Sequence, residues 1–209
     1  MWGKIEANKI TKMYTYPVQL KDAQGTTHPK SYFQDNAKLE TFYIYPVTFV
    51  NSPPIHSFLW DMVNDTYVWK SSKKLIEATH NSTAKNINDV DTVDIISGDP
   101  VLDDEGNQLV TLGLKSVFTA EVKRRQSSLL DLTDKWVIRK TEKGTAIPST
   151  VTTWRDGIRS AGATMVTSIS DAANFVAISA LFDHTYVDGK LTVPAPLYNF
   201  PSRPTGMPE

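Results

Sequence analysis

The residues best suited to metal binding and acid–base chemistry, the histidines, are widely separated in this sequence. The four are His28, His56, His80 and His184. They form no His-x-His pair, no HExxH motif and no short His/carboxylate spacing of the kind that holds a metal on one helix or loop. We interpret them as surface histidines with solvent or one hydrogen-bond partner, and a metal site assembled from distant segments is the minor alternative.

A second candidate is the segment Asp89–Glu105, which contains seven carboxylates and no Lys or Arg. An EF-hand loop needs oxygen ligands at positions one, three and five and a glycine at position six. With Gly106 at six, acidic residues fill positions five and three, but Val101 stands at one and Leu112 at twelve. We interpret the segment as a solvated connector, with calcium binding as the alternative, and predict no metal and no cofactor.

Nucleophilic motifs are not found. The chain has no cysteine, which excludes a disulfide scaffold, a thiolate zinc site and a cysteine nucleophile. It contains neither a Gly-x-Ser-x-Gly elbow nor a phosphate-binding glycine loop. A cell-wall hydrolase would need paired carboxylates in a cleft, whereas the acidic residues here gather in a turn-rich segment. We predict no catalytic residue and no enzymatic activity.

Charge and hydropathy exclude two further classes. The 209 residues carry 22 Lys and Arg against 23 Asp and Glu, so a dedicated nucleic-acid binder is not expected. The basic triplet Lys123–Arg125 is interpreted as a solvated helix face, with a nucleic-acid contact as the alternative. The longest apolar run, Phe175–Phe182, is too short to cross a bilayer, and the N-terminal residues lack a secretory pattern. We therefore expect no membrane partner and synthesis in a cytosol.

The first 88 residues predict a small antiparallel β module with one polar face. Ala7-Asn8 is suited to a tight turn between strands at Trp2–Glu6 and Lys9–Tyr14. A second hairpin is expected at residues 58–70, turning at Asn64-Asp65. Further expectations are a strand at Tyr32-Phe33, a helix capped by Asp35-Asn36, a break at Pro46 and a strand at Lys74–Thr79.

Residues 112–183 predict a helical module. One helix begins near Leu114, and Thr133 is suited to capping a second. The strongest helix is expected after Pro148, with Ser149 as its N-cap, a link at Ile169-Ser170 and a final helix starting at Asp171. Apolar residues at steps of three and four predict the face that packs on the rest of the module, namely Val151, Trp154, Ile158, Ala161 and Met165.

Residues 184–209 predict a β-hairpin of the Asp-Gly type followed by an extended arm. Five prolines occur in the last sixteen residues, which disfavours helix and central strand. Apolar side chains in such an arm need a surface to dock on, either the parent domain or a neighbouring subunit. We favour the neighbour, and the candidate partner contacts are Pro194, Leu197, Tyr198, Phe200 and Arg203.

These elements together predict an α+β protein in four parts. They are an antiparallel β module (1–88), an acidic irregular linker (89–111), a helical hairpin module (112–183), and a β-hairpin with a Pro-rich extended arm (184–209).

Three stretches carry a family resemblance: Met1–Glu6 with Tyr45–Val47, Ser127–Arg139, and Ile147–Ser149 leading into Trp154–Arg159. Their order resembles that of tail-associated proteins of tailed bacteriophages, especially those of marine phages, and the helices with a Pro-rich arm are similar to tail-fibre assembly proteins. Lys135 departs from the pattern, because it separates Asp134 from Trp136 where the family runs Asp-Trp directly. The resemblance covers Leu114–Pro201 best.

The resemblance implies a non-enzymatic structural protein that links or decorates tail and tail fibre. Its expected partners are other phage tail or fibre proteins and copies of itself in a symmetric assembly, without nucleic acid or membrane. Its expected location is the virion tail, after synthesis in the cytoplasm of the host bacterium. The alternative is an assembly chaperone that binds the fibre during folding.

Overall fold

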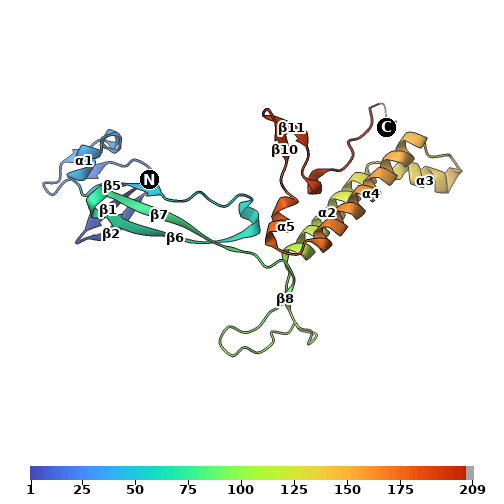
Figure 1. The fold of residues 1–209 in the computed structure, drawn as a ribbon, viewed down its shortest axis with the longest axis horizontal. Helices are drawn as coiled ribbons and strands as arrows, with labels where there is room; N and C mark the ends of the chain where they lie inside the picture. The colour runs from blue at the N-terminus through green and yellow to red at the C-terminus, as the bar shows by residue number, and fades with distance from the viewer. Residues whose placement is uncertain (206–209) are drawn as a thin grey trace. The chain divides into compact units, whose positions relative to one another are not determined.

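The computed structural model describes residues 1–205, and the chain divides into two compact units, Met1–Thr83 and Ala84–Glu209 (Figure 1). The first unit is built around a β-sheet and the second around helices. This arrangement confirms the predicted α+β class. The acidic segment 89–111 lies within the second unit.

The first unit contains a five-stranded sheet with the order β2-β1-β5-β7-β6. The strands are β1 (Trp2–Glu6), β2 (Lys9–Tyr14), β5 (Ile44–Phe49), β6 (Trp60–Lys70) and β7 (Leu75–Ala84). Ala7 and Asn8 turn between β1 and β2 with φ of 48° and 63°, which confirms the first predicted hairpin. The sheet is mixed rather than antiparallel throughout, because β5 and β7 run parallel.

Two features of β5 and β6 were predicted wrongly. Asn64-Asp65 does not turn, and β6 continues through it, because β7 engages both residues: Asn81 donates to the Asn64 carbonyl and His80 contacts the Asp65 carboxylate. Pro46 lies inside β5 instead of ending it. It sits where β5 changes partner from β1 to β7, so its missing N–H removes little pairing.

The core of the first unit lies beside this sheet, under short elements. These are β3 (Leu20–Lys21), β4 (Thr27–His28), the 3-10 helix η1 (Lys30–Gln34) and α1 (Asn36–Glu40). One buried cluster comprises Tyr14, Leu20, Phe33, Leu39 and Ile44, and further buried residues of the unit are Ile5, Leu59, Ile76 and Ala78. Tyr32-Phe33 belongs to η1 and not to the predicted strand, because the Phe33 ring packs edge-on against Trp2. The Asp35 carboxylate accepts from two α1 N–H groups, which confirms the predicted cap.

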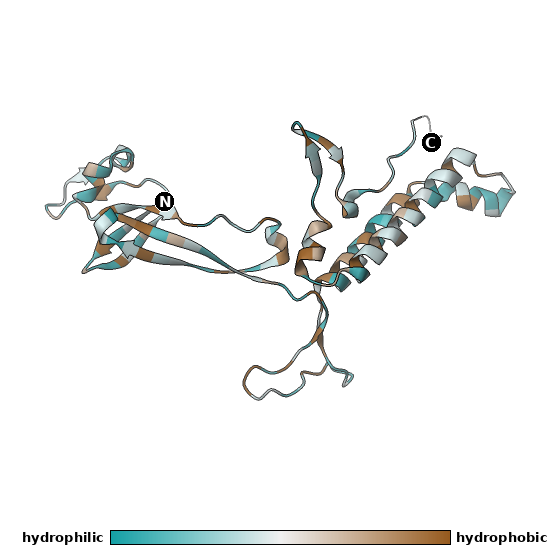
Figure 2. Cartoon of the chain, in the orientation of Figure 1, coloured by the Kyte–Doolittle hydropathy of each residue, from teal (hydrophilic) through white to brown (hydrophobic). Residues whose placement is uncertain are grey.

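The second unit is organised by an antiparallel pair of long helices, α2 (Leu114–Asp131) and α4 (Ser149–Asp171), with α3 (Asp134–Lys143) and α5 (Phe175–Ala180) beside them (Figure 1). Lys115 reaches the Ser170 carbonyl at one end, and Gln126 faces Gly162 further along. A Cβ at Gly162 would lie 2.7 Å from Gln126 Nε2, so this glycine permits the close approach of the helices. Figure 2 shows brown apolar residues recurring along both helices.

The predicted ends of α4 and α5 need correction. Pro148 occupies the N-cap position and Ser149 is the first helical residue. The helix runs unbroken past the predicted link at Ile169-Ser170, because its buried face continues through Ile169 to Ala172. Asp171 ends α4 instead of starting α5, whose first turn is capped by the Asn174 side chain.

The segment 89–111, which we name the acidic arm, is an ordered excursion and not an irregular linker. β8 (Val90–Asp91) and β9 (Val110–Thr111) pair antiparallel at its base, and two isolated bridges, Val93 with Pro100 and Leu102 with Gln108, close two successive turns further out. At the root, the Gly113 N–H donates to the Asp89 carboxylate over 2.7 Å, and a Cβ on Gly113 would lie 2.3 Å from the Asn88 backbone. Local pairing therefore organises this segment despite its composition.

The last described elements of the second unit are a β-hairpin and a 3-10 helix. β10 (Thr185–Val187) and β11 (Lys190–Val193) are joined by Asp188-Gly189, both with positive φ, as predicted. The 3-10 helix η4 (Pro196–Tyr198) follows.

Candidate functional site

The predicted partner-binding arm lies on the helices of its own unit. Ala195 and Leu197 are buried, and Phe200 packs against the cluster of Val151, Trp154 and Ile158. The Trp154 indole N–H donates to the Pro201 carbonyl over 3.1 Å. Leu197 is therefore buried in its own unit and Phe200 packs there too, which corresponds to the alternative of docking on the parent domain: α4 offers the apolar face and the hydrogen-bond donor that the arm needs.

The other candidate contacts remain at the surface to differing degrees. Tyr198 is 45% exposed; its ring stacks on His184 and lies 5.2 Å from the Arg125 guanidinium. Pro194 is half-buried and Arg203 is exposed. Phe200 is half-buried like Pro194, so of the five predicted residues only Leu197 is fully buried. The part of the predicted arm beyond Thr205 lies outside the described residues.

The predicted packing face of α4 is confirmed in the structure. Val151, Trp154, Ile158 and Met165 are buried, and Ala161 is half-buried. The sequence pattern gave no weight to their neighbour Arg155, which is also buried.

Arg155 joins three helices. Its guanidinium donates to the Leu130 carbonyl, the Thr133 hydroxyl and the Asp134 carboxylate, over 2.7 to 2.8 Å. The Thr133 hydroxyl donates in turn to the Leu130 carbonyl, so it does not cap α3 in the predicted way. These bonds hold the start of α3 against the end of α2. In the sequence, the one indication that Arg155 is buried is its position next to Trp154 on the apolar face of α4.

An ion-pair cluster on α2 lies next to the docked arm. Glu121 accepts hydrogen bonds from Arg124 and Arg125, and these two cations lower the pKa of its carboxyl to about 2. Arg125 also faces the Tyr198 ring. The basic triplet predicted as a solvated face is thus partly engaged within the chain.

We expect an NMR titration of the Glu121 carboxyl to give a pKa near 2. Because the folded-state pKa is depressed, the stabilisation is present above the unfolded value of about 4.3 and is lost as the pH falls through the folded value. Arg124→Gln should raise this pKa, since Arg124 is the largest cause of the shift. Lys123→Gln is the matched control on the same helix, and an equal rise with it would refute the assignment.

His28, His80 and His184 have specific polar partners, and the His56 ring lies 5.7 Å from the Phe58 ring. His28 has two polar partners, more than predicted. His28 lies 3.0 Å from the Asp22 carboxylate and 3.1 Å from the Tyr32 hydroxyl, and its hydrogen bond lowers the pKa of Asp22. His80 contacts Asp65 and stacks on Phe49, while His184 accepts from the Ala195 N–H. Each contact joins neighbouring elements of one unit, so these histidines act in folding.

The Asp22–His28–Tyr32 chain borders an open depression of about 760 Å³ that is also lined by Lys4, Lys21 and Lys38. Lys4 pairs with Glu6, and Lys38 pairs with Asp35 and lies over the Tyr32 ring. Lys4 and Lys38 are thus engaged within the chain, whereas Lys21 is exposed to solvent. Within residues 1–205 no cluster of three or more His, Asp or Glu side chains is arranged to hold a metal ion.

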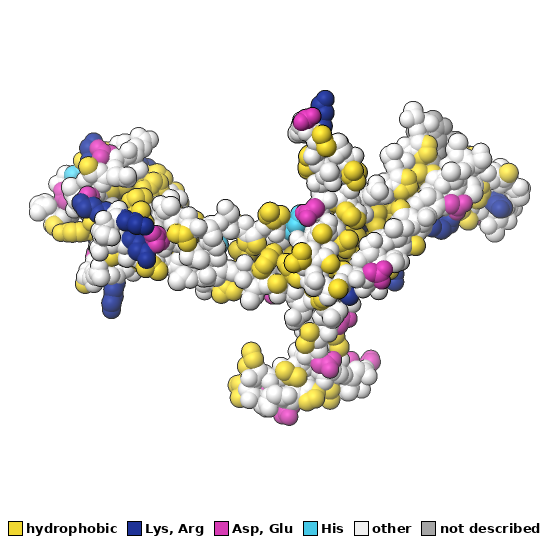
Figure 3. Space-filling view, viewed as in Figure 1, with side chains coloured by type: hydrophobic (Ala, Val, Ile, Leu, Met, Phe, Trp, Pro, Cys, Tyr) yellow, Lys and Arg dark blue, Asp and Glu magenta, His cyan; other side chains and the backbone are white. Residues whose placement is uncertain are grey.

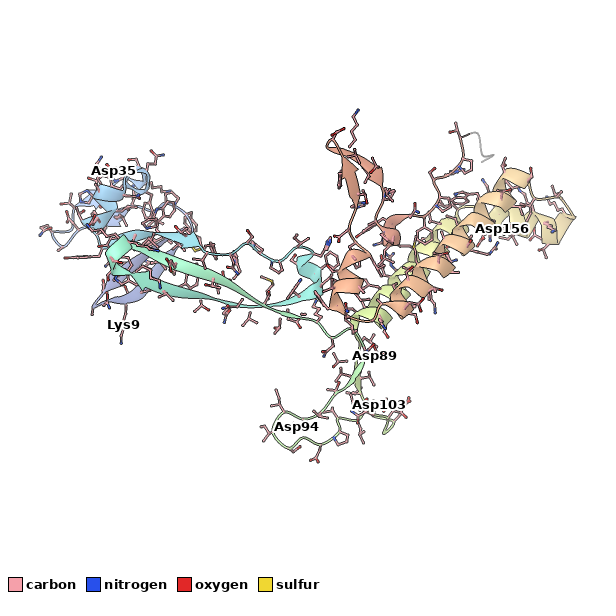
Figure 4. All side chains as sticks on the ribbon, in the orientation of Figure 1. Lys9, Asp35, Asp89, Asp94, Asp103 and Asp156 are labelled. Carbon is pink, nitrogen blue, oxygen red and sulfur yellow. The ribbon has the colours of Figure 1, made fainter. Side chains whose placement is uncertain are left out.

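Large apolar side chains are exposed along much of the chain, and the acidic arm, β10–β11 and β6 each present several of them. In the acidic arm Ile95 and Ile96 are 98% and 93% exposed, and Figure 3 shows apolar and acidic side chains at the surface of the arm. Figure 4 places Asp89 at its root and Asp94 and Asp103 further out. The exposed apolar residues of the other two segments are Tyr186, Val187, Leu191 and Val193 on β10–β11 and Met62, Val63 and Val68 on β6.

The accessible surface is large for the mass. It measures 13,829 Å², whereas a compact monomer of 23.3 kDa exposes about 9,700 Å². Two separate compact bodies with the lengths of the two units would expose about 11,700 Å², still well below the measured area. The excess thus comes from segments that bury little of their surface within either unit.

The chain has no match among protein-family models, curated proteins or solved structures. Among the described residues, no helix combines the length and apolar character needed to cross a bilayer.

Proposed function

We propose that this chain is a non-enzymatic structural component of a bacteriophage tail, which links or decorates tail and tail fibre through protein–protein contacts. The observation that carries the proposal is the accessible surface of 13,829 Å², together with the large apolar side chains exposed on the acidic arm, β6 and β10–β11. Soluble monomers rarely expose extended apolar patches, and such patches are typical of protein–protein interfaces. The resemblance of Ser127–Arg139 and Trp154–Arg159 to tail-associated proteins supports the choice of assembly.

The distribution of these surfaces also supports a linking role. The acidic arm and the β10–β11 hairpin belong to the second unit, while β6 forms one edge of the sheet in the first. An edge strand presents unpaired backbone groups that another chain can extend. A chain with interaction surfaces on both units is suited to contacting more than one neighbour.

Mass spectrometry of purified particles tests this role. In the phage that encodes the chain, we expect a fixed number of copies per particle, comparable to other minor tail proteins. Absence from particles, together with recovery of the chain bound to fibre protein from infected cells, would refute the virion role and support the assembly chaperone. Particles carrying Ile95→Asp should lose the chain, whereas the matched Ser97→Asp change on the same turn should retain it.

A further inference from the structure

The tip of the acidic arm holds two isoleucines in solvent on an ordered turn. The Asp94 carboxylate accepts from the N–H groups of Ile96 and Ser97, over 2.9 and 2.8 Å, and the Gly98 N–H donates to the Asp94 carbonyl. The hydrogen bonds with Ser97 and Ile96 lower the pKa of Asp94, so this turn is held by a carboxylate. The side chains of Ile95 and Ile96 take no part in these bonds, so the backbone and Asp94 hold the turn while both side chains point into solvent.

The charge around this tip restricts what can bind it. Seven carboxylates and no Lys or Arg lie between Lys85 and Lys115. Acidic protein surfaces and anionic lipid would be repelled, whereas an apolar pocket with basic residues at its rim complements the tip in both respects.

The same chain carries such a pocket between α3 and α4. A cavity of about 470 Å³ is lined by the half-buried Val137 and Ile147 and by Lys140, Arg155 and Arg159, together with Thr141 and Thr152. α3 contributes further positive charge, because it contains four basic and two acidic residues. Arg155 and Arg159 pair with Asp134 and Asp156, so Lys140 is the rim cation best placed to meet a carboxylate of another chain. The apolar floor and this lysine match the two isoleucines and the surrounding carboxylates of the arm.

A chain cannot readily fill its own pocket with its own arm. The arm is rooted at the start of α2, where the Leu114 N–H donates to the Asn86 carbonyl. The pocket lies beyond the other end of α2, whose 18 residues span about 27 Å. Figure 1 shows the arm directed away from the pair α2 and α4.

We propose that Ile95 and Ile96 of one copy insert into the pocket formed by Val137, Ile147, Lys140 and Arg159 of a second copy. Two different surfaces meet in this contact, so it is heterologous and continues head to tail into a ring or a filament. Each contact buries a small area and is weak by itself. Closing a ring stabilises the oligomer, because the last contact forms between chains that are already held together. The proposal deepens the function proposed above, on which it rests, by naming a second copy as a partner.

Cysteine cross-linking tests the contact directly, because the chain has no cysteine of its own. Full-length Ile95→Cys and Ile147→Cys chains are mixed, oxidised mildly and run on a non-reducing gel. We expect a disulfide-linked heterodimer to form at least about fivefold faster than with the control pair Val187→Cys and Ile147→Cys, because the contact raises the local concentration of the two thiols. Val187 is a suitable control because it is 55% exposed on the separate β10–β11 hairpin. Equal rates for the two pairs would overturn the proposal.

Reversing the charge of Lys140 at the rim of the pocket distinguishes a specific contact from non-specific association. Lys140→Glu in the Ile147→Cys chain should reduce cross-linking to the control rate, whereas Lys135→Glu, which changes the charge equally but lies outside the pocket lining, should leave it fast. Higher salt should also slow cross-linking between the Ile95→Cys and Ile147→Cys chains when Lys140 is unchanged, because salt screens the attraction between opposite charges. Equal effects of Lys140→Glu and Lys135→Glu would contradict binding of the isoleucines in this pocket. Circular dichroism of each variant establishes that it is folded, and Ile96→Cys provides a second reporter at the tip.

The outcomes also separate this contact from the tail role. If cross-linking stays at the control rate while particles contain the chain, the self-contact is wrong and the tail role stands. If cross-linking is fast but particles lack the chain, the self-contact stands and the tail role is wrong.

Discussion

Deletion of residues 194–209 should destabilise the second unit. The deletion removes the buried Ala195 and Leu197, the Phe200 side chain over Trp154, and the hydrogen bond from Trp154 to Pro201. Loss of this buried area and one hydrogen bond should lower the free energy of unfolding by about 3–5 kcal/mol. Thermal unfolding of the full-length and shortened chains should then differ by about 10 °C or more in the midpoint of the transition of this unit.

The matched control for this deletion is Arg203→Ala. Arg203 is exposed, so its truncation should leave the transition within about 0.5 kcal/mol of the original. An unchanged transition after the whole deletion would contradict the docking seen here, and would return Leu197 and Phe200 to the role of contacts for another subunit.

Trp154→Ala should have an effect of similar size. Trp154 is 4% exposed, lies between Val151 and Ile158 on α4, and donates to the arm. Removing a buried indole leaves a large cavity, and we expect a loss of about 3–5 kcal/mol in urea or thermal unfolding. Trp154→Phe is the informative companion, because it retains a large apolar ring but loses the hydrogen bond and should lose about 1–2 kcal/mol.

The two changes should also be coupled. Trp154 and the arm share one cluster, so the combined loss from Trp154→Ala and the deletion should be smaller than the two separate losses added together. Full additivity, or a loss below about 1 kcal/mol for Trp154→Ala alone, would show that the indole does not support the arm.

The sequence was sufficient wherever a structure depends on residues close together in the chain. The turns at Ala7-Asn8 and Asp188-Gly189 were predicted correctly, because positive φ there suits Asn, Asp and Gly. The Asp35 cap depends only on a side chain and N–H groups two or three residues ahead. The packing face of α4 was predicted because a repeat of three and four residues turns one side of a helix toward the core.

Predictions failed where distant residues compete for the same segment. Asn64-Asp65 has the chemistry of a turn, yet pairing with β7 keeps it within β6. Ile169-Ser170 looked like a link, yet burial of the next apolar turn extends α4 to Asp171. In both cases a tertiary contact outweighs a local preference, because propensities differ by only about 1 kcal/mol between residue types.

The candidate surfaces divide in the same way. The sequence by itself determined that the acidic arm lacks Lys and Arg, that the last residues are apolar and rich in proline, and that α4 has one apolar face. Only the tertiary structure decided that the Leu197–Phe200 segment docks on its own helices while Ile95 and Ile96 stay in solvent. The physical reason is that burial depends on which surface lies within reach. α4 offers an apolar face and an indole donor to the Leu197–Phe200 segment, whereas the hydrogen bonds of Asp94 close the turn of the acidic arm and leave Ile95 and Ile96 in solvent.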